Sequence, residues 1–103
     1  MKKLKTWAGR SVFTYTGSVV EGTRITYGKS WSLSVSAGQY RDLLVHFRGR
    51  TVQMGTIRAV PPKGSVGEWL MNNVTKTAIA SYVGAILVEE GYAERAGGPE
   101  IRF

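Results

Sequence analysis

The chain has 103 residues, of which 43% are hydrophobic and 11% are aromatic. This length suits one domain with one core, and this composition argues against a disordered protein. The absence of cysteine excludes disulfides and thiolate metal sites, and it fits a reducing compartment, which we expect to be the cytoplasm. The sequence also predicts no signal peptide, because no uninterrupted apolar segment follows the basic N-terminus, and no membrane span, because no apolar run is long enough.

The formal net charge of +7 is unevenly distributed. Residues 1–64 hold eleven lysines and arginines against two acidic residues, whereas residues 65–103 hold three against five. A basic surface favours a polyanionic partner such as DNA, although surface charge also serves solubility alone. If DNA is the partner, we expect the N-terminal half to supply much of the phosphate contact.

The first third of the sequence predicts antiparallel strands. Apolar residues alternate with Thr and Ser around Val12–Val20, Ile25–Tyr27 and Trp31–Val35, which is the pattern of half-buried strands. Lys2 and Lys3 precede these strands in a basic terminus, which can either contact phosphates or remain solvated. Aromatic residues interleave with Lys and Arg here, so they can stack single-stranded bases or form core and cross-strand pairs. These aromatic residues are Trp7, Phe13, Tyr15, Tyr27 and Trp31.

A first helix is predicted from Ser36 to about Gly49. Ser36 and Gln39 form a capping box, and Tyr40, Leu43, Leu44 and Phe47 follow at helical spacing. The next segments are a short strand over residues 50–56 and a proline-containing loop over residues 58–64.

Two further helices and a hairpin are predicted in the remaining residues. Ser65 and Glu68 form a second capping box, and Asn73 or Thr75 caps a third helix that ends before Gly91. Two strands, residues 92–96 and 99–103, then pair across Gly97-Gly98.

From Ser36 onward, this order of helix, strand, helix, turn, helix and hairpin resembles a winged helix-turn-helix domain. The segment ILVEEGYAERAGGPEIRF (residues 86–103) is similar to the junction of recognition helix and wing in bacterial regulators. We therefore expect one α+β domain. It combines an N-terminal antiparallel β segment (residues 1–35) with a winged-helix-like core of three helices and a C-terminal β-hairpin wing (residues 36–103).

The resemblance implies contacts with duplex DNA, because winged-helix domains present the third helix to the major groove and the hairpin to the backbone. The residues that it implicates are Thr75, Lys76, Thr77, Ser81, Tyr82, Arg95, Gly97 and Gly98. Basic charge adds further candidates for phosphate contacts, namely Lys2, Lys3, Arg48, Arg50 and Lys63.

The third helix also supports a different hypothesis. It is apolar on nearly every side, and Lys76 is its single basic residue. The helix therefore has few side chains that could form hydrogen bonds with the edges of DNA bases. Such a helix is usually buried, either against a partner through residues such as Ala85 and Ile86 or under the N-terminal strands of its own chain. The sequence thus predicts either a small dimeric DNA-binding protein or a protein-interaction or homo-oligomeric module.

Catalysis is not expected. The chain has one histidine, His46, which lies beside the apolar stripe of the first helix, and it has no phosphate loop or nucleophile motif. Glu89 and Glu90 lie at a helix end, where both can be solvated. We expect no enzyme activity, no cofactor and no metal.

Overall fold

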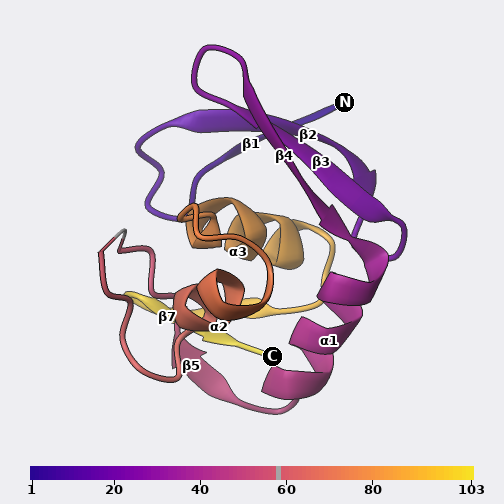
Figure 1. Ribbon diagram of the computed structural model, residues 1–103. Helices are drawn as coiled ribbons and strands as arrows, with labels where there is room; N and C mark the ends of the chain where they lie inside the picture. Colours follow the sequence, from indigo (N-terminus) through magenta and orange to yellow (C-terminus); the bar gives the residue numbers. More distant parts are fainter. Residues whose placement is uncertain (58) are drawn as a thin grey trace.

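Residues 1–57 and 59–103 are described by the computed structural model (Figure 1), so Arg58 of the predicted loop lies outside the described residues. The N-terminal part is a four-stranded antiparallel sheet in which each strand pairs with the next. Its strands are β1 (Lys2–Lys5), β2 (Val12–Ser18), β3 (Gly22–Tyr27) and β4 (Trp31–Ser36).

The alternation of apolar and polar residues along the strands gives the sheet one buried and one solvated face, as the sequence predicts. Phe13, Tyr15, Ile25 and Val35 are buried beneath the sheet. The edge strand β1 was not among the predicted strands. Lysine-rich segments are typical of solvated termini, but lysines also protect an exposed sheet edge from pairing with other chains.

Helix α1 (Ala37–Phe47) begins at the predicted capping box. Ser36 Oγ accepts a hydrogen bond from the Gln39 backbone N–H (3.1 Å), and Gln39 Oε1 accepts one from the Ser36 N–H (2.9 Å). The box satisfies N–H groups that have no partner inside the helix. It thereby fixes the point where the chain leaves β4 and enters α1.

The second sheet has three strands in the order β5-β7-β6, and the C-terminal strand lies in the middle. Its strands are β5 (Thr51–Gln53), β6 (Glu94–Gly97) and β7 (Glu100–Arg102). The predicted hairpin is confirmed, because β6 and β7 pair antiparallel, but its turn is Gly98-Pro99 and lies one residue later than the predicted Gly97-Gly98.

Helix α2 (Val66–Asn73) has half of its predicted capping box. Ser65 Oγ accepts from the Glu68 N–H (3.1 Å), but the Glu68 carboxylate accepts from the Gly64 N–H (2.8 Å) rather than from Ser65. The Ser65 N–H instead donates to the Pro62 carbonyl, which closes the preceding loop.

Helix α3 (Ala80–Glu89) begins later than predicted. Asn73 lies inside α2, Thr75 Oγ1 accepts from the Thr77 N–H, and no side chain caps α3. The C-terminal end is as predicted. Gly91 has φ +84°, and the Tyr92 N–H donates to the Leu87 carbonyl (2.9 Å), which is the pattern of a glycine-terminated helix.

Helix α3 lies between the two sheets, next to α2 (Figure 1), and its Val83, Ile86 and Leu87 are fully buried. The alternative that this helix is buried under the N-terminal strands is therefore confirmed. Gly84 makes the close packing possible, because a Cβ atom there would lie 2.5 Å from Met54 Cε and 3.0 Å from the Trp7 ring. One core joins residues 1–35 to residues 36–103.

Candidate functional site

The residues implicated at the start of the third helix lie close together, but most of them precede the helix. Thr75, Lys76 and Thr77 belong to the connection between α2 and α3, and Lys76 and Thr77 are exposed. Ser81 and Tyr82 lie in the first turn of α3 and are half-buried. The predicted presentation of this segment as a helix is wrong, because α3 begins only at Ala80.

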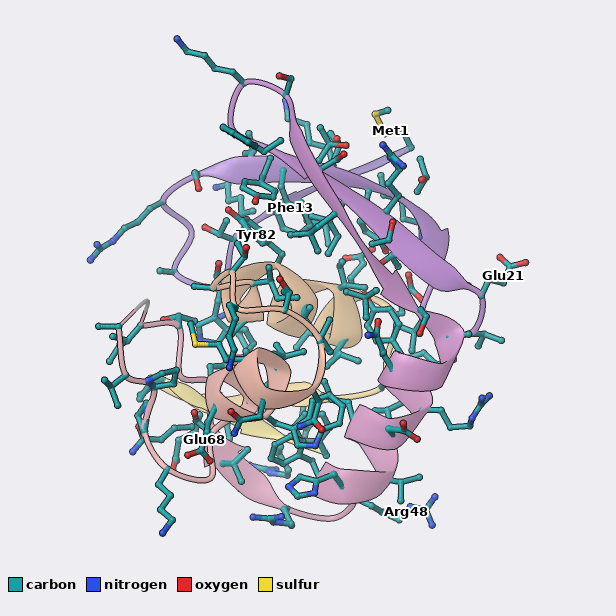
Figure 2. The ribbon with its side chains drawn as sticks, in the orientation of Figure 1. Met1, Phe13, Glu21, Arg48, Glu68 and Tyr82 are labelled. Atoms are coloured by element: carbon teal, nitrogen blue, oxygen red, sulfur yellow. The ribbon has the colours of Figure 1, made fainter. Side chains whose placement is uncertain are left out.

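A pocket of about 360 Å³ lies between this connection and the β3–β4 hairpin. Tyr27 and Tyr82 stack at its base, with ring centres 4.9 Å apart and planes at 27°. Tyr82 also meets Phe13 edge-on at 5.1 Å, and Figure 2 shows these two side chains next to each other beneath the sheet. These contacts hold Tyr82 in one orientation.

Trp31 forms the outer part of the pocket. Its side chain is 70% exposed, although it lies on the same face of the hairpin as the buried Val35. Lys76 and Thr77 complete the opposite side. The Lys76 ammonium group has no ion pair within the described residues. An aromatic surface next to a free cation can bind a planar ring that carries an anionic group.

The solvated face of the four-stranded sheet is the second candidate surface. Strand register aligns hydroxyl and cationic side chains in two adjacent rows and places no carboxylate in either row. The rows are Lys3, Thr14, Thr26 and Ser32, and Thr16, Arg24 and Ser34. Such groups are common donors to phosphate oxygens. The alternation of Thr and Ser with apolar residues is the sequence signal that could have identified this face.

Arg95, predicted to contact the DNA backbone, binds the chain itself. Its guanidinium carbon lies 4.0 Å from the centre of the Trp7 ring, and Nη2 donates to the Trp7 carbonyl oxygen (2.9 Å). Gly97 and Gly98 are exposed at the hairpin turn. Lys2 Nζ lies 5.9 Å from the centre of the Tyr15 ring.

The remaining basic candidates do not join the pocket. Arg48 ends α1, at the opposite end of the molecule from the four-stranded sheet (Figure 2). Arg50 lies over the Phe47 ring at 5.5 Å and donates to the His46 carbonyl (3.3 Å). Lys63 is exposed in the loop before α2. The predicted residues therefore do not form a single continuous interface.

The predicted partner-binding residues of the third helix are not accessible. Ala85 is 9% exposed and Ile86 is fully buried, and both contribute to the core of their own chain. The placement of a dimer interface on these residues is therefore wrong. The apolar character that suggested it is explained by the two sheets that enclose α3.

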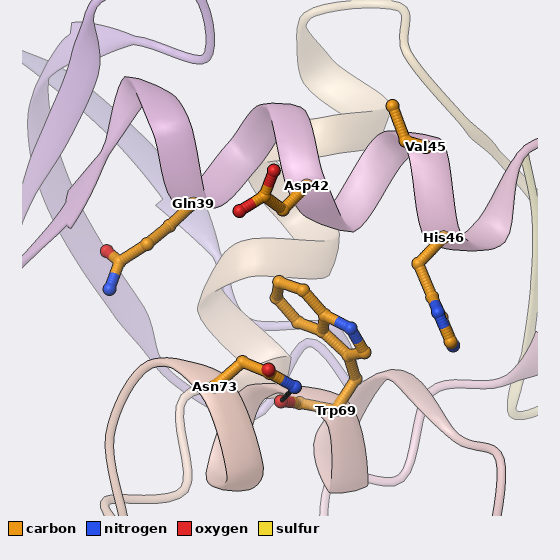
Figure 3. Close-up of a pocket in the computed structure, with 6 residues that line it drawn as sticks. All are labelled: Gln39, Asp42, Val45, His46, Trp69 and Asn73. Carbon is orange, nitrogen blue, oxygen red and sulfur yellow. Dashed lines mark hydrogen bonds between the residues drawn. The ribbon is translucent and has the colours of Figure 1, made fainter.

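A cleft of about 420 Å³ separates α1 from α2 (Figure 3). Its polar side chains are largely engaged in local contacts. Asn73 Nδ2 donates to the Trp69 carbonyl (2.8 Å), and the His46 ring packs edge-on against Phe47 at 4.6 Å. Within the described residues, no hydrogen bond joins His46 to Asp42, so the cleft does not present a coupled proton-transfer pair.

Among residues 1–57 and 59–103, no group of three or more His, Asp or Glu side chains is arranged to hold a metal ion. No described helix has the length and apolar character needed to cross a membrane. No family model, curated protein or solved structure matches this chain.

Proposed function

We propose that this protein is a non-catalytic nucleic-acid-binding protein whose aromatic pocket accepts an unpaired base. The observation that carries the proposal is the position of Trp31, an exposed aromatic ring beside the stacked Tyr27 and Tyr82 and opposite Lys76. An exposed tryptophan has no role in the core of the domain, and its ring is available for stacking.

The chemistry of the pocket supports this ligand. Stacking of a base on an aromatic side chain contributes about 1–3 kcal/mol and tolerates any sequence. The Lys76 ammonium group lies at the same pocket, where it can neutralise the phosphate next to the stacked base. Thr77 adds a hydroxyl group that can donate to a phosphate oxygen.

The charge distribution supports a polyanionic ligand beyond one nucleotide. The net charge of +7 raises the rate of encounter with nucleic acid, and Lys3 and Arg24 lie on a sheet face whose rows contain no carboxylate. A strand whose base occupies the pocket can continue across the β3–β4 hairpin toward this face.

The element order α1-β5-α2-α3-β6-β7 and the sheet order β5-β7-β6 support a winged-helix-like arrangement of the C-terminal part. Insertion of α3 into the major groove has less support, because Glu89 is the single exposed residue of α3 and the others are buried or half-buried. We therefore propose the pocket, rather than the helix, as the centre of binding. The cysteine-free composition supports a reducing compartment such as the cytoplasm.

The proposal is tested by fluorescence anisotropy with labelled oligo-dT and with a mixed-sequence duplex, each over a salt series. We expect the single strand to bind more tightly, with an affinity that falls log-linearly with salt. Lys76→Glu should weaken binding by about tenfold or more, whereas Arg48→Glu makes the same change in net charge away from the pocket and should have a small effect. Equal effects of the two variants would show that only net charge matters and would reject the pocket.

A further inference from the structure

A second surface, distinct from the aromatic pocket, has the properties of a peptide-binding groove. It is a depression of about 310 Å³ bounded by α1, by the turn between β2 and β3, and by Tyr92, which comes three residues after the end of α3. Its apolar lining residues include Val19, Val20, Leu44, Val45 and Tyr92.

The groove gathers exposed apolar side chains on a fixed backbone. Val20 is 69% exposed, Val45 is 60% exposed and Tyr92 is 38% exposed. The backbone on both sides is held in place, because the Val19 N–H donates to Glu90 Oε1 (2.9 Å) and the Tyr92 N–H donates to the Leu87 carbonyl. A preformed apolar groove binds a ligand with little loss of conformational freedom.

Two arginines lie along the same groove. Arg41 lies on α1 and Arg48 directly follows the last residue of that helix, and both line the groove. Both side chains are exposed, and within the described residues neither forms an ion pair or a hydrogen bond.

Asp42, next to Arg41 in the chain, lines the separate cleft between α1 and α2. Two other carboxylates close to the groove in the chain have hydrogen-bond partners of their own. Glu90 accepts hydrogen bonds from the Tyr15 hydroxyl and the Val19 N–H, and Glu21 Oε1 accepts one from the Ser18 hydroxyl. The two guanidinium groups therefore remain available to a ligand.

We propose that this groove docks a short acidic and hydrophobic peptide segment of another protein. A bulky apolar side chain of the segment packs among Val20, Val45 and Tyr92, and flanking carboxylates pair with Arg41 and Arg48. This combination gives complementarity of both shape and charge, and guanidinium groups bind carboxylates through paired hydrogen bonds.

Other occupants fit the groove less well. Tyr92 is the one aromatic ring among the lining residues of the groove, and the valines around it offer no flat surface for stacking, so a nucleic acid would gain less from this lining. In a second copy of this chain, the segment Leu87–Glu90 combines apolar and acidic residues, but it is fixed at the end of α3. The inference is independent of nucleic-acid binding at the aromatic pocket.

The test is a titration of isotopically labelled protein with a blocked synthetic peptide in which Leu and Phe alternate with Asp and Glu. We expect the amide signals of Val20, Val45 and Tyr92 to shift, and we expect no such shifts with a control peptide in which Lys replaces Asp and Glu. Arg48→Glu should weaken binding of the acidic peptide about tenfold or more, whereas Arg24→Glu, an equal change in net charge on the four-stranded sheet, should leave binding nearly unchanged.

Three results would overturn the proposal. They are the absence of shifts in the groove, equal binding of the acidic and the basic peptide, and equal weakening by the two variants. Shifts of the groove signals with oligo-dT in place of the peptide would likewise assign the groove to nucleic acid. Unfolding curves of both variants verify that a loss of binding is not a loss of fold.

Discussion

The guanidinium group of Arg95 packs on the Trp7 ring at 4.0 Å and donates a hydrogen bond of 2.9 Å to the Trp7 carbonyl. This contact joins β6 of the small sheet to the segment that follows β1, across 88 positions of sequence. A residue that sequence reasoning assigns to DNA thus connects the two sheets.

We expect Arg95→Ala to lower the free energy of unfolding by about 1–2 kcal/mol, because it removes a cation–π contact and a charge-assisted hydrogen bond. Arg102→Ala is the matched control. It removes an exposed ion pair with Glu94, which should contribute no more than about 1 kcal/mol. Urea denaturation measures both values, and a larger effect at Arg102 would contradict this account of Arg95.

Gly84 should be intolerant of even the smallest side chain. Gly84→Ala places a methyl group against Met54 and Trp7, and we expect it to lower the free energy of unfolding by about 1–3 kcal/mol, although alanine favours helix formation. In α1, Gly38→Ala meets no atom closer than 3.7 Å and should be neutral or stabilising by up to about 1 kcal/mol. If thermal unfolding shows equal shifts for the two variants, α3 is not packed as tightly as described.

Two buried tyrosines predict a loss of stability at alkaline pH. Burial, the hydrogen bond to Glu90 and the nearby carboxylates raise the pKa of Tyr15, and burial raises the pKa of Tyr40 to about 12. The ordinary value is about 10, so above that pH the folded state holds these protons while the unfolded chain releases them. The contribution of these two tyrosines to the free energy of unfolding should therefore be complete below about pH 10. It should be lost progressively as the pH rises from about 10 to 12.

Urea unfolding at a series of alkaline pH values checks this expectation. Tyr40→Phe removes one of the two groups and should make the decline shallower. A decline of the same slope in the variant and the unmodified protein would assign the pH dependence to other groups.

Trp31→Ala should separate binding from stability. The Trp31 side chain is 70% exposed, so its removal should change the free energy of unfolding by less than about 0.5 kcal/mol. Loss of one stacked base should weaken oligo-dT binding about tenfold or more. Tyr92→Ala removes an aromatic side chain from the peptide groove and should leave oligo-dT binding unchanged. Anisotropy titrations compare the two variants, and equal effects would argue against a specific role of Trp31.

Local chemistry explains which parts of the fold can be predicted from the sequence. The capping box at Ser36, the helix end at Gly91 and the C-terminal hairpin each depend on a few adjacent residues. Strand β1 and the burial of α3 depend on contacts between distant segments, so sequence patterns leave alternatives open for both. Thr75 has the side chain of a helix cap, but the structure uses it in a local turn.

The candidate site can also be predicted only where it depends on adjacent residues, and not where it depends on contacts between distant segments. The segment that contains Lys76, Thr77 and Tyr82 can be identified from its place between two predicted helices, but its partner Trp31 comes from a distant hairpin. Glu90 illustrates the opposite case. From the sequence we expect Glu90 to be solvated at a helix end. In the structure its Oε2 atom accepts a hydrogen bond from the Tyr15 hydroxyl group (2.7 Å). Neither relationship has a signal in local spacing.

The most direct test of base binding at the aromatic pocket is a two-dimensional NMR titration of the labelled protein with oligo-dT, in which the three tryptophan indole N–H signals are followed separately. We expect the Trp31 indole signal and the Lys76 and Thr77 amide signals to shift together, while the signal of the buried Trp7 stays in place. Saturable binding that leaves the Trp31 signal unchanged, or an absence of binding at low salt, would contradict base binding at this pocket.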